Sequence, residues 1–186
     1  MLRSATVALL ICLAAGAHAD TIDEKAQLCA ACHGEKGIPE DKAFPIIWGQ
    51  HAGYLYLQLR DFQKGVRKNE IMQPIAEALS KDDMMALAEY FAAKQWPSVA
   101  QPAAGAEDAA TARRVNGSIG CTGCHLDRYQ GDGSVARIAD QSHDYLLKTM
   151  LDFRTRTRAN NPGMSDLMNA ATEDELKAMA AYLSGL

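Results

Sequence analysis

Outside two short motifs, the sequence has almost no cysteine. Of its five cysteines, four belong to the motifs and the fifth, Cys12, lies in an apolar segment near the start. No thiol is therefore left over for a structural disulfide. The chain also lacks the basic stripe that binds nucleic-acid phosphates, and its formal net charge is −4, so we expect no nucleic-acid partner. Nucleotide-binding and protease fingerprints are absent, and no segment alternates as a β-strand does.

The first nineteen residues are typical of an export signal. Arg3 supplies the positive start, residues 5–15 form a short apolar stretch, and residues 17–19 are a small-x-small cleavage site. The stretch is shorter than the about 20 apolar residues that a membrane span needs. We therefore expect cleavage after Ala19, with Cys12 lost in the removed segment.

Two copies of one motif lie 92 positions apart. They are Cys29-Ala-Ala-Cys32-His33 and Cys121-Thr-Gly-Cys124-His125. Residues three apart share a face of a helix, so the two thiols of each copy can add to the two vinyl groups of one porphyrin. The adjoining imidazole, His33 or His125, can then ligate the iron. The motifs predict two covalently bound haem c groups.

Other uses of a Cys-x-x-Cys pair are a redox dithiol, a structural disulfide and half of a zinc site. A zinc ribbon closes over about 15–20 residues between its Cys pairs, and the gap here is several times longer. A redox dithiol needs no His after its second Cys, whereas both copies have one. Haem attachment is favoured over these alternatives.

The two halves of the chain align with each other well beyond the motifs when one is shifted by 91 or 92 positions. The matches include Gln50 with Gln141, Tyr54 with Tyr145, Asp61-Phe62 with Asp152-Phe153, and Arg67 with Arg158. Such self-similarity indicates a duplicated domain. We expect a signal peptide at residues 1–19, a first haem domain at 20–96, a linker at 97–108 and a second haem domain at 109–186.

Each unit has a helical pattern, which predicts an all-α fold of two small units, each wrapped around one haem. Middle helices are expected over residues 54–62 and 145–153. The last helix of each unit follows an N-cap signal, Ser80-x-x-Asp83 or Thr172-x-x-Glu175. The apolar stripes of these helices are Met84, Leu87, Ala88 and Phe91 in the first unit, and Leu176, Met179, Ala180 and Leu183 in the second. The linker either crosses both units or hangs free.

The second axial ligand of each iron separates an electron carrier from an enzyme with an open site. Met72 and Met164 align in the repeat, on expected loops before the last helices, and a thioether is a suitable haem ligand. We predict both as ligands, with Met168 as a rival at the second haem. His51 and His143 do not align with each other and are assigned surface or loop-packing roles. The methionines in helix patterns are expected in the core: Met84, Met85, Met150 and Met179.

With these features the chain resembles the two-haem class I cytochromes c of the cytochrome c4 family. The likeness rests on both motifs, on residues 48–55 and 61–67, on the Met72 and Met164 loops and on the closing helices. It implies two cytochrome c domains facing each other, His/Met ligation at both irons, and a periplasmic electron carrier rather than an enzyme. The implied partners are redox proteins: a donor cytochrome complex or dehydrogenase, and a terminal oxidase or other acceptor, with transient docking to membrane complexes.

Two alternatives to a free carrier stay open. The same two-domain plan occurs as the haem subunit of larger oxidoreductases such as flavocytochrome c sulfide dehydrogenases. Catalysis at an open haem, as a peroxidase or in sulfur-compound oxidation, is the other. The alternate arginines Arg154, Arg156 and Arg158 are interpreted as a solvated helix end or as propionate partners, in preference to a docking patch.

The second half departs from the family pattern near its motif. Ala136 stands where the first half has Pro45, whose carbonyl can orient the proximal His; the carbonyl of Ala136 can serve as well. Gly117 and Gly120 predict a poorer helix before Cys121 than the one before the first motif. We expect unequal surroundings, and unequal potentials, for the two haems.

Overall fold

A computed structural model describes residues 21–186, so the expected export signal and its cleavage site lie outside the described residues. Within this range the chain is helical, apart from an isolated β-bridge between Asp132 and Val135. The helices are α1 Ile22–His33, α2 Ala52–Gln63, α3 Met72–Glu77, α4 Lys81–Ala92, α5 Ala106–Ile119, α6 Thr122–His125, α7 His143–Arg154, α8 Pro162–Ala170 and α9 Glu173–Ser184. In residues 21–186 none of them has the length and apolar character of a membrane span. The all-α prediction is confirmed.

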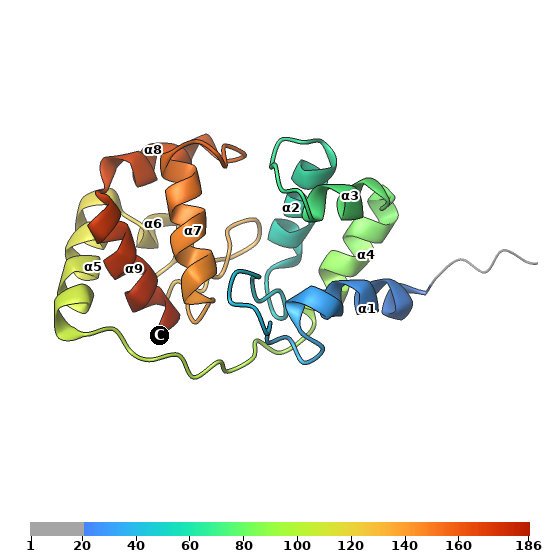
Figure 1. The fold of residues 1–186 in the computed structure, drawn as a ribbon, viewed down its shortest axis with the longest axis horizontal. Coiled ribbons are helices and arrows are strands. Elements are labelled where there is room, and N and C mark those ends of the chain that lie inside the picture. Colours follow the sequence, from blue (N-terminus) through green and yellow to red (C-terminus); the bar gives the residue numbers. More distant parts are fainter. Residues whose placement is uncertain (1–20) are drawn as a thin grey trace, which may run out of the picture.

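The helices form two groups that lie side by side, α1 to α4 and α5 to α9 (Figure 1). In the first half, α4 packs on α1 and α2, and α3 packs on α2; in the second, α9 packs on α5 and α7, and α8 packs on α7. The middle helices α2 and α7 include the predicted spans. Corresponding helices of the repeat thus occupy corresponding places, because the two halves have the same apolar spacing.

The closing helices α4 and α9 have the predicted capping boxes and core stripes. The hydroxyls of Ser80 and Thr172 accept from the backbone N–H three residues later, and the acidic side chains there reach back. All eight predicted stripe residues are buried. Met85 corrects one expectation: it is 39% exposed, because it falls beside the buried stripe of α4 rather than on it. Met84, Met150 and Met179 lie in the core as predicted.

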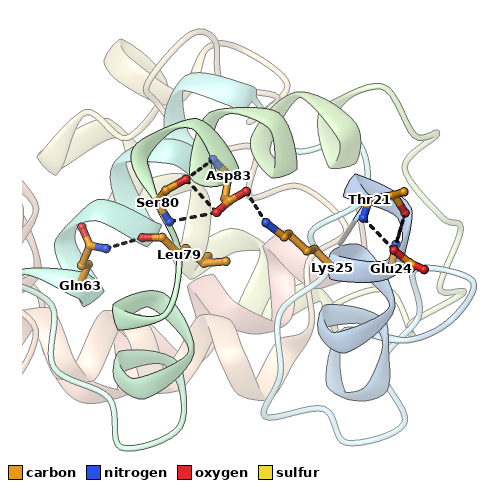
Figure 2. Close-up of polar contacts among 7 residues, drawn as sticks. All are labelled: Thr21, Glu24, Lys25, Gln63, Leu79, Ser80 and Asp83. Carbon is orange, nitrogen blue, oxygen red and sulfur yellow. Dashed lines mark hydrogen bonds and ion pairs between the residues drawn. The ribbon is translucent and has the colours of Figure 1, made fainter. Parts of the chain in front are cut away.

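Helix α1, which carries the first motif, is fastened to α4 by an ion pair. Lys25 Nζ lies 2.6 Å from Asp83 Oδ1. Figure 2 shows this pair and the contacts by which the same carboxylate closes the capping box of Ser80. Thr21 and Glu24 form a second capping box at the start of α1. Gln63 Nε2 donates to the carbonyl of Leu79 at 2.7 Å, just before α4. The motif therefore lies on a helix that is tied at its first turns to the closing helix.

The segment between the halves has no helix from residue 95 to 105 and runs along one side of the molecule (Figure 1). It does not hang free. Gln101 Nε2 donates to the carbonyls of Gln141 and Ser184 at 3.0 and 3.1 Å, and Gln101 Oε1 accepts from the backbone N–H of His143. Helix α5 begins at Ala106, inside the expected linker, because its acidic first turn (Glu107, Asp108) suits a helix N-terminus.

The halves meet through hydrogen bonds that are repeated when the halves are exchanged. The side chain of Gln50 bonds to the backbone of Arg137, and that of Gln141 bonds to the backbone of Ile46. Both the glutamines and their targets correspond in the repeat. The principal helix–helix contacts in the described chain lie within one half or the other, so loops and side chains make much of this interface.

A close backbone approach adds to the interface. The N–H of Tyr54 donates to the carbonyl of Gly133 at 3.1 Å. A Cβ at Gly53 would lie 2.8 Å from the same oxygen, so the contact requires glycine. His51 Nε2 lies 2.8 Å from the carbonyl oxygen of Gln130, which gives this histidine the packing role predicted for it.

Candidate haem sites

The first motif lies on the last turns of α1, an unbroken helix from Ile22 to His33. Cys29 and Cys32 are half-buried free thiols on this helix. His33 is only 7% exposed, and its Nδ1 lies 2.8 Å from the carbonyl oxygen of Pro45. That bond sets the tautomer, with the proton on Nδ1 and the lone pair on Nε2, the form that ligates a metal.

The histidine of the second motif is held by a carbonyl as in the first motif, but the helix that carries the motif is interrupted. Helix α5 ends at Gly120, whose φ of 74° is left-handed, and the motif continues on the one-turn helix α6. The poorer helix predicted before Cys121 is confirmed as a break. His125 is 8% exposed, with Nδ1 2.8 Å from the carbonyl oxygen of Ala136. Alanine therefore supplies the carbonyl that proline supplies in the first half, since any residue has one.

Burial shapes the chemistry of both motifs. It lowers the pKa of His33 and His125, an effect opposed by the carbonyl bonds, and so favours neutral imidazoles. Burial also raises the pKa of the Cys29 and Cys121 thiols, whereas a redox dithiol is activated by a lowered pKa. The redox-dithiol alternative therefore loses support.

The residues present fit a covalently attached haem. All four described cysteines are free, so each motif keeps both thiols for thioether bonds. In residues 21–186 neither imidazole Nε2 has a hydrogen-bond partner. In this range no group of three or more His, Cys, Asp or Glu side chains is placed to hold a metal ion.

The predicted axial methionines begin short helices rather than lying on loops. Met72 is the first residue of α3, and its N–H donates to Asn69 Oδ1 at 2.8 Å. Met164 lies in the first turn of α8, and its N–H donates to Asn161 Oδ1 at 3.1 Å. Asparagine side chains explain the difference, since each turns the preceding loop into a helix start. Asn161 is the N-cap of α8, and Asn69 accepts from the N–H groups of Ile71 and Met72 just before α3.

The rival methionine of the second half has a core position. Met168 is 4% exposed and belongs to the buried cluster of α5, α7, α8 and α9, whereas Met164 is half-buried and packs against that cluster, as Cys121 does. Because Met168 is committed to the core, Met164 is the methionine that remains available to ligate an iron.

His143 is half-exposed, with Nδ1 2.8 Å from Asp144 Oδ1.

The three alternate arginines point to three different places. Arg154 Nε donates to the carbonyl of Ala171, Arg156 pairs with Asp166 on the surface, and Arg158 is buried at 7% exposed. They do not form one docking patch. Only Arg154 lies on α7, whereas Arg156, with a positive φ of 60°, and Arg158 lie in the turn that follows, so the three side chains leave the chain in different directions.

The buried arginine belongs to a cluster between the halves that sequence reasoning missed. Arg158 donates to Tyr54 Oη at 3.3 Å, and its repeat partner Arg67 donates to Tyr145 Oη at 3.1 Å. Both arginines also donate to Gln58 Oε1. The pairings cross between halves, so the repeat alignment contained both partners but did not show which pairs form.

This cluster concentrates positive charge at the interface. Burial alone would raise the pKa of Tyr145, but the charges of Arg67 and Arg158 outweigh it and lower that pKa to about 7. Asp61, which pairs with Arg60 and accepts from Asn160, is a buried carboxylate beside the cluster. Two guanidinium groups suit an anionic group, and the carboxylates of haem are of that kind.

Comparison with known proteins supplies close likenesses. No family model matches the sequence. The chain is 36% identical over 172 residues to a thiosulfate dehydrogenase electron acceptor of Stutzerimonas stutzeri strain A1501, covering 87% of this chain and 80% of that protein. It is 33% identical over 168 residues to a cytochrome c4 of Thiocapsa roseopersicina, covering 86% and 87%. The crystal structure of reduced recombinant cytochrome c4 from Pseudomonas stutzeri superposes with a TM-score of 0.80 at 26% identity, over 89% of this chain and 96% of that one.

Proposed function

The chain belongs to the cytochrome c4 family, and on this basis we propose that it is a periplasmic carrier between a dehydrogenase or cytochrome complex and an oxidase or other acceptor. As a member, it is a dihaem electron-transfer cytochrome rather than an enzyme, it binds two c-type haems, and its partners are redox proteins. The observation that carries the proposal is a pair of buried imidazoles, each held by a carbonyl beside two free thiols.

We further propose that His33 and Met72 ligate one iron and His125 and Met164 the other. Each bound haem supplies a one-electron couple. The carbonyls of Pro45 and Ala136 hold the imidazoles in the ligating tautomer. A thioether from Met72 or Met164 would supply the second protein ligand of each iron, which would leave no site open to substrate. In these roles no side chain needs to do acid–base chemistry, because the haem carries the electron.

Ligation is tested by spectroscopy on the purified holoprotein. Two haems per chain and a methionine-to-ferric-iron charge-transfer band from both are expected. Carbon monoxide binding to the reduced native protein would instead support the open-haem enzyme. A potentiometric titration should resolve two unequal midpoints, because the second motif lies on a broken helix and the first does not. One wave with identical midpoints would contradict this.

The electron donor is a second matter, and one observation favours a sulfur-compound dehydrogenase. The relative that is 36% identical is named as the electron acceptor of thiosulfate dehydrogenase. We propose the same role here, in preference to a permanent subunit of a flavocytochrome c sulfide dehydrogenase. A thiosulfate dehydrogenase with thiosulfate should reduce both haems at a rate that saturates with cytochrome concentration. Co-purification with a flavoprotein chain would favour the subunit role.

Export and domain division complete the proposal. The mature chain should begin at Asp20, which mass spectrometry of the periplasmic protein can test. We propose domains at residues 20–96 and 109–186 joined by the segment 97–108. The absence of helix from 95 to 105 and the grouping of helix contacts within each half support this division.

A further inference from the structure

The hydrogen bond that orients His33 continues into the other half of the molecule. His33 Nδ1 donates to the carbonyl oxygen of Pro45 at 2.8 Å. The N–H of the same peptide unit belongs to Ile46, and it donates to Gln141 Oε1 at 2.8 Å. Ile46 is 1% exposed, so water does not compete for this N–H. One peptide group thus joins an imidazole of the first half to an amide of the second.

The second half contains the same chain of bonds in the opposite direction. His125 Nδ1 donates to the carbonyl oxygen of Ala136 at 2.8 Å. The N–H of Arg137, which closes that peptide unit, donates to Gln50 Oε1 at 2.8 Å. Each proximal histidine is therefore connected through one peptide group to a glutamine of the other half.

The two glutamines are built for this role. Each is 3% exposed, and each Nε2 donates to the carbonyl of the residue whose N–H its Oε1 accepts: Gln50 to Arg137 at 2.9 Å, and Gln141 to Ile46 at 2.9 Å. Each Oε1 also accepts from the backbone N–H of the residue that follows the glutamine, His51 or Ser142. These partners fix which amide atom is oxygen, since an N–H must face an acceptor.

A peptide group transmits such a bond. When its N–H donates to a strong acceptor, the peptide is polarised and its carbonyl becomes a better acceptor, because hydrogen bonds in a chain reinforce each other. A better acceptor draws the Nδ1 proton, makes the imidazole a stronger electron donor to a metal and stabilises the oxidised iron. We propose that Gln141 is a positioning residue that lowers the potential of the first haem, and that Gln50 does so for the second. The proposal rests on His33 and His125 being the proximal ligands.

The test is a crossed pair of substitutions in the holoprotein. Gln141→Met keeps the side-chain length and removes the acceptor, so the first haem should become easier to reduce while the second is unchanged. An about threefold change in the oxidised-to-reduced ratio is expected, or about 30 mV for one electron. Gln50→Met should shift the second haem alone. Haem methyl resonances in NMR, followed during stepwise oxidation, assign each potential to its haem.

A matched control separates tuning from loosening of the interface. Gln101→Met removes a glutamine that bonds to the backbone of Gln141 but touches neither orienting peptide, and it should leave both potentials unchanged. Gln141→Glu keeps an acceptor oxygen, so the potential of the first haem should stay at or below that of the wild type. If Gln141→Met does not retain both haems, the potentials of Gln141→Glu and Gln50→Met test the proposal in its place.

Several results would overturn the proposal. It fails if each glutamine shifts the haem of its own half, if both haems shift together, or if Gln101→Met or Gln141→Glu raises the first potential as Gln141→Met does. An error in the assignment of His33 as an iron ligand would be detected by a different measurement, the spectrum of His33→Ala. His33→Ala would then leave the low-spin spectrum of the first haem intact, whatever the glutamine variants do.

Discussion

The proposed second iron ligands, Met72 and Met164, can be tested by single substitutions. We expect Met72→Ala to remove the charge-transfer signal of the first haem only, and Met164→Ala that of the second only, since each lies at the start of its own short helix. Met168→Ala is the matched control. It should keep both signals but destabilise the protein by about 2–5 kcal/mol, because its side chain is in the core.

The contrary outcome is specific. Loss of the second signal in Met168→Ala, with Met164→Ala unchanged, would exchange the roles of these two residues. Optical spectra with thermal unfolding of the same samples distinguish loss of a ligand from loss of packing.

The carboxylate of Asp83 makes the tie between α1 and α4 pH-dependent. Hydrogen bonds from Lys25, then from Ser80, lower the pKa of Asp83 from 3.8 to about 2. A lowered carboxylate pKa contributes stability that is fully present above the unfolded value of 3.8 and is lost as the pH falls through about 2. Asp83→Asn should therefore lower the melting temperature at pH 5, and the difference from wild type should shrink toward pH 2.

The neighbouring Asp82 is the control for this effect. It is exposed and takes part in no ion pair among the described residues, so Asp82→Asn should leave the melting temperature nearly unchanged at both pH values. A constant difference between wild type and Asp83→Asn from pH 5 to 2 would contradict the assignment.

At the scale of the helices, one glycine makes the two haem motifs differ. The first motif lies at the end of an unbroken helix, whereas the second follows a break at Gly120. Gly120 has a φ of 74° and ends α5, while Gly117 lies within that helix without positive φ. Gly120→Ala should destabilise the protein by about 1–2 kcal/mol, since an L-residue resists the left-handed conformation. Gly117→Ala should stabilise it by about 0.5–1 kcal/mol, since alanine favours helix interiors.

Denaturant unfolding of the two variants checks the opposite signs. An added Cβ meets nothing within 4 Å at either position, so crowding does not enter the comparison. A stabilising Gly120→Ala would mean that α5 can continue into the second motif as α1 does into the first.

Helix positions were also the feature that local sequence predicted best. The closing helices were predicted by capping boxes and by apolar residues every three to four positions, and all eight stripe residues are buried. Prediction was weaker where a short helix depends on one cap. The starts of α3 and α8, at Met72 and Pro162, were expected as loops because the asparagines that accept from their first turns, Asn69 and Asn161, stand amid other loop-forming residues.

In the whole molecule, the approach of the two halves depends on a residue without a side chain. Gly53→Ala would place a Cβ 2.8 Å from the carbonyl oxygen of Gly133. The halves must then shift, at a cost of roughly 1–3 kcal/mol as for an overpacked core. Faster hydrogen exchange at the N–H of Tyr54, which donates to that carbonyl, should report the shift, with both haems retained. Unchanged protection of this N–H would contradict the prediction.

The two motifs, the repeat, the helical class and the capped closing helices could be predicted from the amino-acid sequence alone. The motifs, the helical class and the caps depend on residues within one or two turns of each other, and the repeat depends on the similarity of two stretches, so all are visible in a linear chain. The contacts between the halves became visible only in the folded molecule. Arg67 bonds to Tyr145, Arg158 bonds to Tyr54, and each glutamine bonds to the peptide that orients the histidine of the other half. The repeat aligns Gln50 with Gln141, but an alignment shows only that two residues hold equivalent positions, not which residues they contact. Contact depends on how two folded surfaces pack, and residues about 90 positions apart leave no local pattern of it.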